Sequence, residues 1–283
     1  MDVITFQHAP DPLVPLDQVT HANFRCKNFG HYFSVNQKTR ILLQKAGDSP
    51  LQPGFSADCR QCDRLAGFLD EVKARHPDYY ARPVPAFGDE MPRLLVIGLA
   101  PGMHGANRTG RPFTGDFAGI LLYRTLYKFG FANHEGSASA EDNLQLMQCR
   151  ITNAVKCLPP ENKPEPREIR QCNHYLAAEI ANFRKGRGSA LLALGAIAHQ
   201  AALMALGLKR GAYPFSHGAV HTLPGDCLAH GSTSGNLTAS LTLYDSYHCS
   251  RYNTQTRRLT PDMFEQVFEK ICADMASHQK TGD

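Results

Sequence analysis

The chain of 283 residues is long enough for one large domain or two small ones. Hydrophobic residues make up 42% of it and charged residues 20%, a composition that excludes disordered and fibrous proteins. The 30 Lys and Arg against 26 Asp and Glu leave a formal net charge of +4, which permits nucleic-acid binding without requiring it.

The N-terminal segment gives no sign of export or membrane insertion. It lacks a basic stretch followed by an apolar one, and no apolar run in the chain approaches the ~20 residues that a membrane span needs. We therefore expect a cytoplasmic protein, in which the nine cysteines do not form a disulfide framework. Residues 1–50 are poorly patterned and contain early prolines, so we expect a partly ordered extension before a folded domain over 51–283.

Strands and helices alternate along this domain. Short apolar runs predict buried strands, and apolar spacings of three and four predict helices. The expected strands cover 93–99, 150–156, 190–194 and 241–247, and the expected helices cover the region around 65–72, the region around 120–127, and 167–184, 196–206 and 261–275. We expect an extended linker over 81–92 and a loop over 221–238. This alternation favours a parallel sheet with helices on both faces.

Four cysteines are spaced as two pairs that could hold one metal centre. Cys59 and Cys62 form C-x2-C, and Cys157 and Cys172 form C-x14-C, with Cys157 just past a strand. Four thiolates suit either a tetrahedral zinc or an iron–sulfur cluster, and spacing alone does not choose between them. Free cysteines are also common core residues, which is the interpretation we keep for the remaining ones outside this set.

A Gly-rich loop follows the first strand, in the segment GLAPGMHGANRTGRPFTGD over 98–116. Its glycines allow a ligand close to the backbone, and its place at the carboxyl edge of a parallel sheet is where α/β proteins form sites. It matches neither a Walker loop nor a dinucleotide fingerprint. The mixture of Asn107, Arg108, Arg111 and Phe113 suits a planar polar ligand near phosphates.

The last strand delivers His248 to the same edge, and a loop with Ser250, Arg251, Tyr252 and Asn253 follows. Interleaved Arg and Tyr suit a phosphate backbone and a base stack, although a solvated basic turn is the plainer interpretation. Asn153 lies inside the apolar run RITNAVK, where an amide is costly unless something satisfies it. Its position therefore favours a function.

Three segments resemble the signature motifs of uracil-DNA glycosylases: GLAPGMHGANRTGRPFTGD, ITNAVKCLPPENKP and DSYHCSRYNTQTRRLT. The branch they resemble is the iron–sulfur branch called family 5 or type B, and the resemblance spans about residues 55–275. It implies a three-layer α/β/α fold with a central four-stranded parallel sheet, and 51–283 as the catalytic domain. It also implies a [4Fe–4S] cluster on Cys59, Cys62, Cys157 and Cys172. The cluster is expected to hold together the loops of the protein that contact DNA.

The resemblance also implies roles for single residues. Phe113 matches the aromatic that stacks on a flipped uracil, Asn153 the pocket amide, and His248 the catalytic histidine that donates to uracil O2. Gly98 and Ala100 match pocket positions at the strand end. The acidic or amide side chain that related families place early in the first motif is replaced by Leu99 and Ala100, so we expect Asn107 to position the water. The expected DNA contacts are Arg108, Arg111, Arg251, Tyr252 and Asn253, with Arg257 and Arg258 as further candidates for phosphates.

One departure from the family pattern is Cys249, where the motif commonly has proline. The expected activity is excision of uracil, with hypoxanthine and other deaminated bases as further substrates, by a monomer acting on DNA. Two alternatives remain at this point: a catalytically weak DNA-damage binder of the same fold, and a structural zinc protein without a DNA role.

Overall fold

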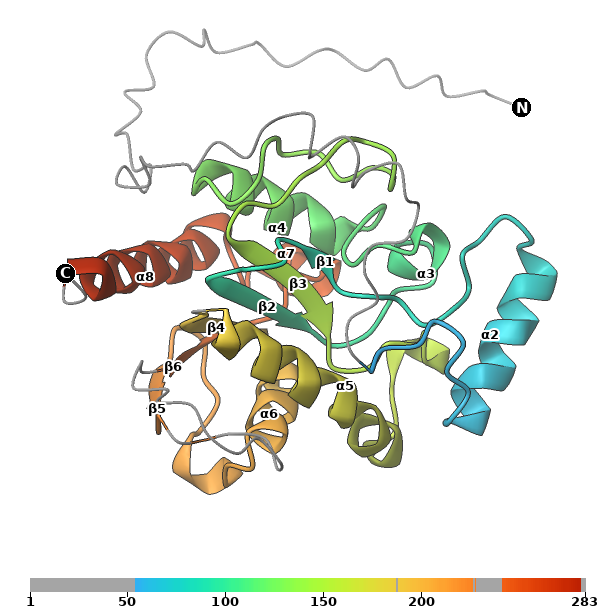
Figure 1. Ribbon diagram of the computed structural model, residues 1–283. Coiled ribbons are helices and arrows are strands. Elements are labelled where there is room, and N and C mark those ends of the chain that lie inside the picture. The colour runs from blue at the N-terminus through green and yellow to red at the C-terminus, as the bar shows by residue number, and fades with distance from the viewer. Residues whose placement is uncertain (1–53, 187, 226, 228–240, 281–283) are drawn as a thin grey trace, which may run out of the picture.

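The computed structural model describes residues 54–186, 188–225, 227 and 241–280, which form an α/β domain around one six-stranded sheet (Figure 1). The strand order is β1-β3-β2-β4-β6-β5. The four middle strands are parallel: β3 (Cys149–Asn153), β2 (Leu94–Gly98), β4 (Ala190–Leu194) and β6 (Leu241–Ser246). The predicted four-stranded parallel centre is therefore confirmed. The extension predicted over residues 1–50 lies outside the described residues.

Both edges of the sheet carry a short antiparallel strand that the sequence did not predict. β1 (Phe87–Gly88) pairs with β3 inside the segment expected to be a linker, and β5 (Val220–Leu223) pairs with β6 where the expected loop begins. β1 has only two residues, and β5 is exposed along most of its length, so neither shows the apolar run of a buried strand.

Helices cover both faces of the sheet, because neighbouring residues of each strand point to opposite sides. In β2, Leu94 and Val96 pack with α4 (Phe117–Lys128) and α8 (Pro261–Lys280), while Leu95 and Ile97 pack with α5 (Pro166–Lys185) and α6 (Ala196–Ala205). Figure 1 shows α4 and α8 above the sheet and α5 and α6 below it. This is the predicted three-layer arrangement. No helix in the described part of the chain is both long and apolar enough to cross a membrane.

A third apolar cluster holds α2 (Asp63–Arg75) against the rest of the domain. Leu65, Leu69 and Val72 of α2 pack with Val155 and Leu158, which follow β3. α2 lies at the right-hand side of Figure 1, next to the N-terminal part of α5. The segment before α2, the turn after β3 and the start of α5 therefore meet in one place.

Two short helices lie in segments expected to be loops. α3 (Ala106–Thr109) interrupts the Gly-rich loop, and α7 (Arg251–Gln255) follows His248. α7 begins at Ser250, whose hydroxyl accepts a hydrogen bond from the backbone N–H of Asn253. Ser is a favoured residue at this position because it satisfies a free N–H of the first turn. Arg251, Tyr252 and Asn253 are therefore helical.

Candidate active site

Gly98 and Asn153 end neighbouring strands as a register pair, and they form the floor of the candidate site. A Cβ atom on Gly98 would lie 2.4 Å from Asn153 Oδ1 and 2.7 Å from Phe113 Cζ. Only glycine fits between these two side chains. The Oδ1 atom of Asn153 is buried and has no hydrogen-bond partner, which is a costly arrangement in a strand that is otherwise satisfied. The amide therefore presents an acceptor for a ligand.

Phe113 covers this floor from the Gly-rich loop. Its backbone has φ of 54°, a left-handed conformation that is rare for an aromatic residue. Such strain is characteristic of functional sites, where the surrounding structure holds a side chain in a required orientation. The ring is buried and lies nearly parallel to the ring of His248, with 5.9 Å between the centroids. The predicted aromatic, amide and histidine are thus brought together.

His248 enters the site two residues after the end of β6. Its Cβ lies 3.7 Å from the place of a Cβ on Gly195, the residue that follows β4. The ends of β2, β3, β4 and β6 therefore bring these residues together at one edge of the sheet, as expected for parallel strands. Burial lowers the pKa of His248 to about 4, so the imidazole is neutral at physiological pH and can donate one N–H.

Asn253 and Cys249 lie near His248 in the chain and have different surroundings. Asn253 donates from Nδ2 to the backbone carbonyl of His248 at 2.8 Å, so this side chain supports the histidine loop. Cys249 is fully buried in the core cluster with α4 and α8, and burial raises the pKa of its thiol. Where the family pattern has proline, this chain therefore places a core thiol rather than a group facing the pocket.

Asn107 is the predicted water-positioning residue. Its side chain is fully buried, and neither Oδ1 nor Nδ2 has a hydrogen-bond partner. The backbone of Asn107 is tied to Gly102 and Ala81, so the residue itself is fixed. An amide with both ends unpaired in a fixed buried position has no structural purpose that we can identify, and a water or ligand would satisfy it.

Asp116 is a carboxylate that the sequence interpretation missed. It caps α4 by accepting from the backbone N–H of Gly119 at 2.8 Å, and its Oδ2 would lie 2.5 Å from a Cβ on Gly105. Burial raises its pKa despite the hydrogen bonds from the helix N-terminus. The signal available in the sequence was an acidic residue closing the Gly-rich loop, but helix capping alone accounts for that pattern.

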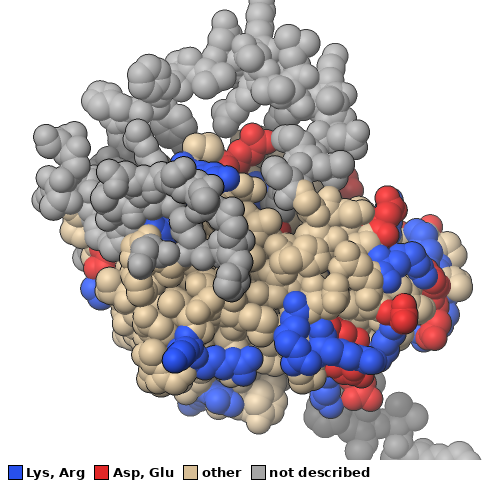
Figure 2. All heavy atoms as spheres, turned by 60° about the horizontal axis from the view of Figure 1, so that its bottom comes forward, with Lys and Arg blue, Asp and Glu red and all other residues tan. Residues whose placement is uncertain are grey.

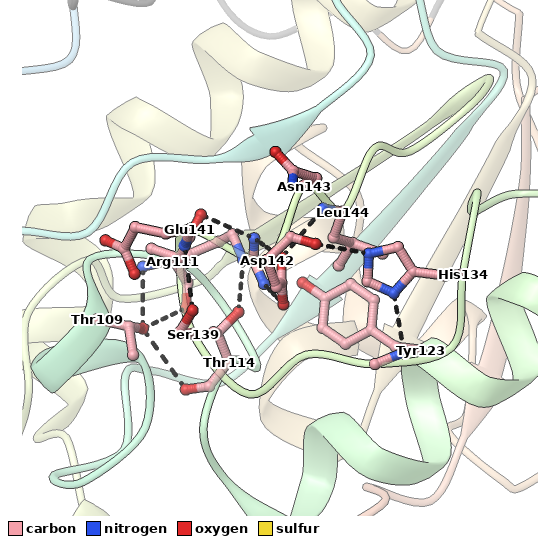
Figure 3. A network of polar contacts seen from close by, with 12 residues as sticks. Thr109, Arg111, Thr114, Tyr123, His134, Ser139, Glu141, Asp142, Asn143 and Leu144 are labelled. Atoms are coloured by element: carbon pink, nitrogen blue, oxygen red, sulfur yellow. Dashed lines mark hydrogen bonds and ion pairs between the residues drawn. The ribbon is translucent and has the colours of Figure 1, made fainter.

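Arg111 is not available to DNA, contrary to the predicted role. Its guanidinium is buried and forms a two-pronged ion pair with Asp142 at 2.8 and 2.7 Å. Nε donates to Thr114 at 2.7 Å, and the cation lies 4.9 Å from the centre of the Phe87 ring. Figure 3 shows Arg111 pointing toward Asp142 within a network that also includes His134 and Thr109. Arg111 therefore anchors the segment around Asp142 to the Gly-rich loop.

Two of the other predicted DNA contacts, Arg108 and Arg251, line a groove of about 930 Å³. Arg124 and Asp116 line it too. Arg251 is exposed, with its guanidinium 5.2 Å from the centre of the Phe117 ring. Tyr252 is 70% exposed, which is unusual for a tyrosine and leaves its ring free to contact a partner.

Arg257 and Arg258 lie just beyond α7, and both are exposed. The guanidinium of Arg258 lies over the Tyr247 ring. Figure 2 shows that basic residues on its face form separate groups, mixed with acidic ones on the right, where α2 lies. The net positive charge is therefore not concentrated on that face.

Ala100 is partly buried and packs against the cluster beneath α2. This cluster includes Cys157 and Cys172, so Ala100 connects the Gly-rich loop to the region of the cysteines.

The four predicted cysteine ligands line one small cavity. Cys59 and Cys62 precede α2, Cys157 follows β3, and Cys172 lies in α5. Cys172 Sγ accepts a hydrogen bond from the backbone N–H of Lys156 at 3.3 Å. Burial raises the pKa of Cys172 to about 11, and burial together with the neighbouring thiols raises that of Cys157. Thiols with a raised pKa, such as those of Cys157 and Cys172, stay protonated until a metal ion replaces the proton.

Two ion pairs fix the helices that bring these cysteines together. Arg64 on α2 binds Glu168 on α5 through two hydrogen bonds of 2.8 and 2.7 Å. On the other side, the buried Lys156 ammonium binds Glu179 of α5 at 2.8 Å. Because Lys156 lies three residues after Asn153, α5 holds both the cysteine cavity and the segment that follows the pocket floor.

Comparisons with known proteins agree with this geometry. The family model described as the uracil DNA glycosylase superfamily matches residues 85–272. A type-5 uracil-DNA glycosylase of Thermus thermophilus is 44% identical over 214 residues, which cover 74% of this chain and 90% of that protein. One from Mycobacterium leprae is 40% identical over 239 residues, covering 81% and 96%. One from Pyrobaculum aerophilum is 36% identical over 221 residues, covering 77% and 89%.

Proposed function

The chain belongs to the uracil DNA glycosylase superfamily, and from this we propose that it hydrolyses the N-glycosidic bond of uracil in DNA, the first step of base-excision repair. The observation that carries the proposal is the unpaired, buried Oδ1 of Asn153 at a strand end that Phe113 and His248 enclose. Hypoxanthine and other deaminated bases are further proposed substrates.

Asn153 recognises the base by its hydrogen-bonding pattern. The unpaired Oδ1 accepts from N3–H of uracil, and Nδ2 donates to O4. Cytosine presents an acceptor at N3 and a donor at C4, so the same amide meets it with the wrong pattern. Phe113 supplies the flat surface on which the extruded base stacks, after an extrusion that costs a few kcal/mol.

His248 stabilises the departing base. Cleavage leaves negative charge on uracil, and a fixed donor aimed at O2 stabilises that charge most strongly where water is excluded. The lowered pKa supports a neutral imidazole that donates one N–H rather than a cation. Asn253 holds the His248 backbone in place, so we assign Asn253 a positioning role rather than the predicted DNA contact.

The attacking water is positioned by Asn107, with Asp116 as a second group. The two unpaired ends of the Asn107 amide can each bind a water, and the Asp116 carboxylate lies against Gly105 of the same loop. An amide orients water without taking its proton, whereas a carboxylate whose pKa is raised by burial can accept one.

DNA contacts come from the groove and from α7. Arg108 and Arg251 bind phosphates beside the pocket, and the exposed Tyr252 fills the gap that the extruded base leaves. Arg257 and Arg258 extend the cationic surface beyond α7. We further propose that the acting species is a monomer and that it acts in the cytoplasm.

Cys59, Cys62, Cys157 and Cys172 would hold a [4Fe–4S] cluster through their thiolates. The bonds between iron and these thiolates would tie α2, the turn after β3 and α5 together. A single zinc ion is the alternative occupant of this four-cysteine site. Zinc would need the four sulfurs about 3.8 Å apart. We propose the cluster rather than zinc because the motifs of the chain resemble the iron–sulfur branch of the superfamily.

Iron content and visible absorption test the cluster assignment. Purified protein is expected to be brown and to contain iron, while Cys157→Ser loses both. Cys149→Ser is the matched control, since Cys149 is equally buried but lies outside the cavity. A colourless protein with stoichiometric zinc would establish a structural zinc site instead.

Base release from labelled duplexes tests the activity. Substrates carry one U·G, U·A or hypoxanthine·T pair, and alkali reveals the abasic product. Cleavage by the wild type, with loss of cleavage but retained binding in His248→Ala, supports the enzyme. If the iron-loaded wild type binds these duplexes without cleaving them, the chain is a damage-binding protein of the same fold.

A further inference from the structure

A second cluster of possible ligands lies behind the active site, and it takes no part in the mechanism above. His199 of α6, His221 of β5 and Asp245 of β6 place one ligand atom each within 4.8 Å of the others. Asp245 Oδ1 lies 2.7 Å from His199 Nδ1, and Oδ2 lies 3.1 Å from His221 Nε2. Asp245 and His199 are buried, while His221 keeps 12% of its side chain exposed.

The hydrogen bond of His199 Nε2 determines whether Nδ1 directs a hydrogen or a lone pair toward Asp245. Nε2 lies 2.9 Å from the backbone carbonyl of Tyr213, and a carbonyl only accepts, so Nε2 carries the hydrogen. A neutral imidazole has one N–H, which leaves a lone pair on Nδ1. That lone pair is directed at a carboxylate oxygen 2.7 Å away. Two acceptors in this position require a positive charge between them.

A bound metal ion would supply this charge. Within the described residues, the ion pairs of Asp245 are with the two histidines, and no lysine or arginine pairs with it. A buried carboxylate requires compensation, because isolating its charge from water is costly. The carbonyl on Nε2 is the outer partner that metal-binding histidines characteristically have, since it fixes the tautomer and the ring orientation.

We propose that His199 Nδ1, His221 Nε2 and the Asp245 carboxylate bind a divalent metal ion of the zinc class. Two imidazoles and one carboxylate are a common donor set for zinc, with the fourth position left to water. Ligand atoms around tetrahedral zinc lie about 3.3 Å apart, and here one ligand atom from each residue already lies within 4.8 Å of the other two. The exposed edge of His221 gives an ion access.

The site would join three elements behind the catalytic histidine. Asp245 lies three residues before His248 on the same chain segment, and α6 begins directly after Gly195, which contacts His248. A bound ion would therefore fix the base of the histidine loop from α6 and the edge strand β5. The inference does not depend on the identity of the base that the enzyme releases.

Metal analysis of the iron-loaded protein tests the proposal. Protein is treated with excess Zn²⁺, desalted and assayed for zinc and iron together. The wild type is expected to retain about one zinc in addition to its iron, and His221→Gln and Asp245→Asn are expected to bind zinc at least about 100-fold more weakly. His76→Gln, which removes a histidine at the end of α2, should match the wild type. His221→Gln is the less disruptive of the two ligand variants, because this side chain lies at an edge strand.

Cobalt distinguishes this site from the cysteines. Co²⁺ on nitrogen and oxygen ligands gives weak visible bands without a thiolate charge-transfer band in the difference spectrum. Retention of one ion with such a spectrum, lost in His221→Gln, supports the proposal. A thiolate band, equal retention by both ligand variants, or no zinc above background in the wild type would overturn it, and a proton would then be the charge that His199 and Asp245 share.

Discussion

Asn253 donates a hydrogen bond from its side-chain amide to the backbone carbonyl of His248 at 2.8 Å, from α7 back to the segment that precedes it. The contact places no atom of Asn253 on a reacting group. We therefore expect Asn253→Ala to lower kcat about 5-fold with little change in KM, the effect of losing about 1 kcal/mol of support for the histidine loop. Single-turnover base release measures the change. Thr256→Ala, at the residue that follows this helix, is the control, and an unchanged kcat in Asn253→Ala would remove the positioning role.

Gly98 and Gly102 provide a matched test of the pocket floor. A Cβ on Gly98 would lie 2.4 Å from Asn153 Oδ1, whereas a Cβ on Gly102 would lie 3.8 Å from its nearest neighbour, Asp116 Oδ2. Gly98→Ala is expected to lower kcat/KM about 100-fold by displacing the amide and Phe113, and Gly102→Ala to leave it nearly unchanged. Steady-state assays on a U·G duplex compare them. Equal activity in the two variants would show that the floor does not contact the base.

We expect Asn107 to be required for activity while lowering the stability of the fold. Its buried amide is unpaired at both ends, so Asn107→Leu is expected to raise the free energy of unfolding by about 1–2 kcal/mol while lowering base release about 100-fold. Asn173→Leu is the reverse control, because Asn173 Nδ2 donates to the Ala201 carbonyl at 2.9 Å. Thermal unfolding and base release are measured on both. A less stable Asn107→Leu protein would show that the amide is satisfied in the folded state.

The pKa of His248 predicts how stability depends on pH. Burial lowers it to about 4 from an ordinary value near 6.5. Between these values the unfolded state binds more protons than the folded state, so the contribution of His248 to stability is lost as pH falls from about 6.5 to about 4. Relative to His248→Gln, the wild type is expected to lose about 1–2 kcal/mol between pH 7.5 and 5. Unfolding curves at both pH values test this, and a constant difference would show that the imidazole is solvated.

Substitution of Arg111 should affect stability alone, and substitution of Arg251 should affect DNA binding alone. Arg111→Gln leaves Asp142 without its buried partner, so we expect a loss of about 3 kcal/mol of stability and an unchanged salt dependence of binding. Arg251→Gln should bind DNA more weakly, with a salt slope smaller by about one and no change in stability. Fluorescence titrations at several salt concentrations give the slopes. An Arg111→Gln protein that folds normally but has a smaller slope would restore Arg111 as a phosphate contact.

The sequence was sufficient for the elements whose pattern is local. The apolar runs identified all four parallel strands, and the spacing of apolar residues identified the long helices. It was insufficient where the deciding partner is distant. Arg111 looks like a phosphate contact until Asp142, 31 residues later in an irregular segment, is placed beside it. β1 was missed because its two residues become a strand only through pairing with β3.

The placement of Asn153 and His248 at one edge of the sheet could be predicted, because parallel strands deliver their carboxyl ends to the same edge. Asp116 was missed because its hydrogen bond to Gly119 is the ordinary use of an acidic residue before a helix. Its approach to Gly105 depends on how the Gly-rich loop folds back, which no local pattern reveals. The His199, His221 and Asp245 group was missed for the same reason, since its members come from three separate elements.

The pairing of Gly98 with Asn153 also determines how the pocket moves. Both residues belong to the central strands, whose hydrogen bonds open only when the domain unfolds, so the floor of the pocket is among its most rigid parts. Because the amide of Asn153 is held in place, the nucleic acid has to change its conformation to bring the base to it. We therefore expect two steps of selection, in which weakly paired bases leave the duplex more readily and Asn153 then discriminates among the extruded bases.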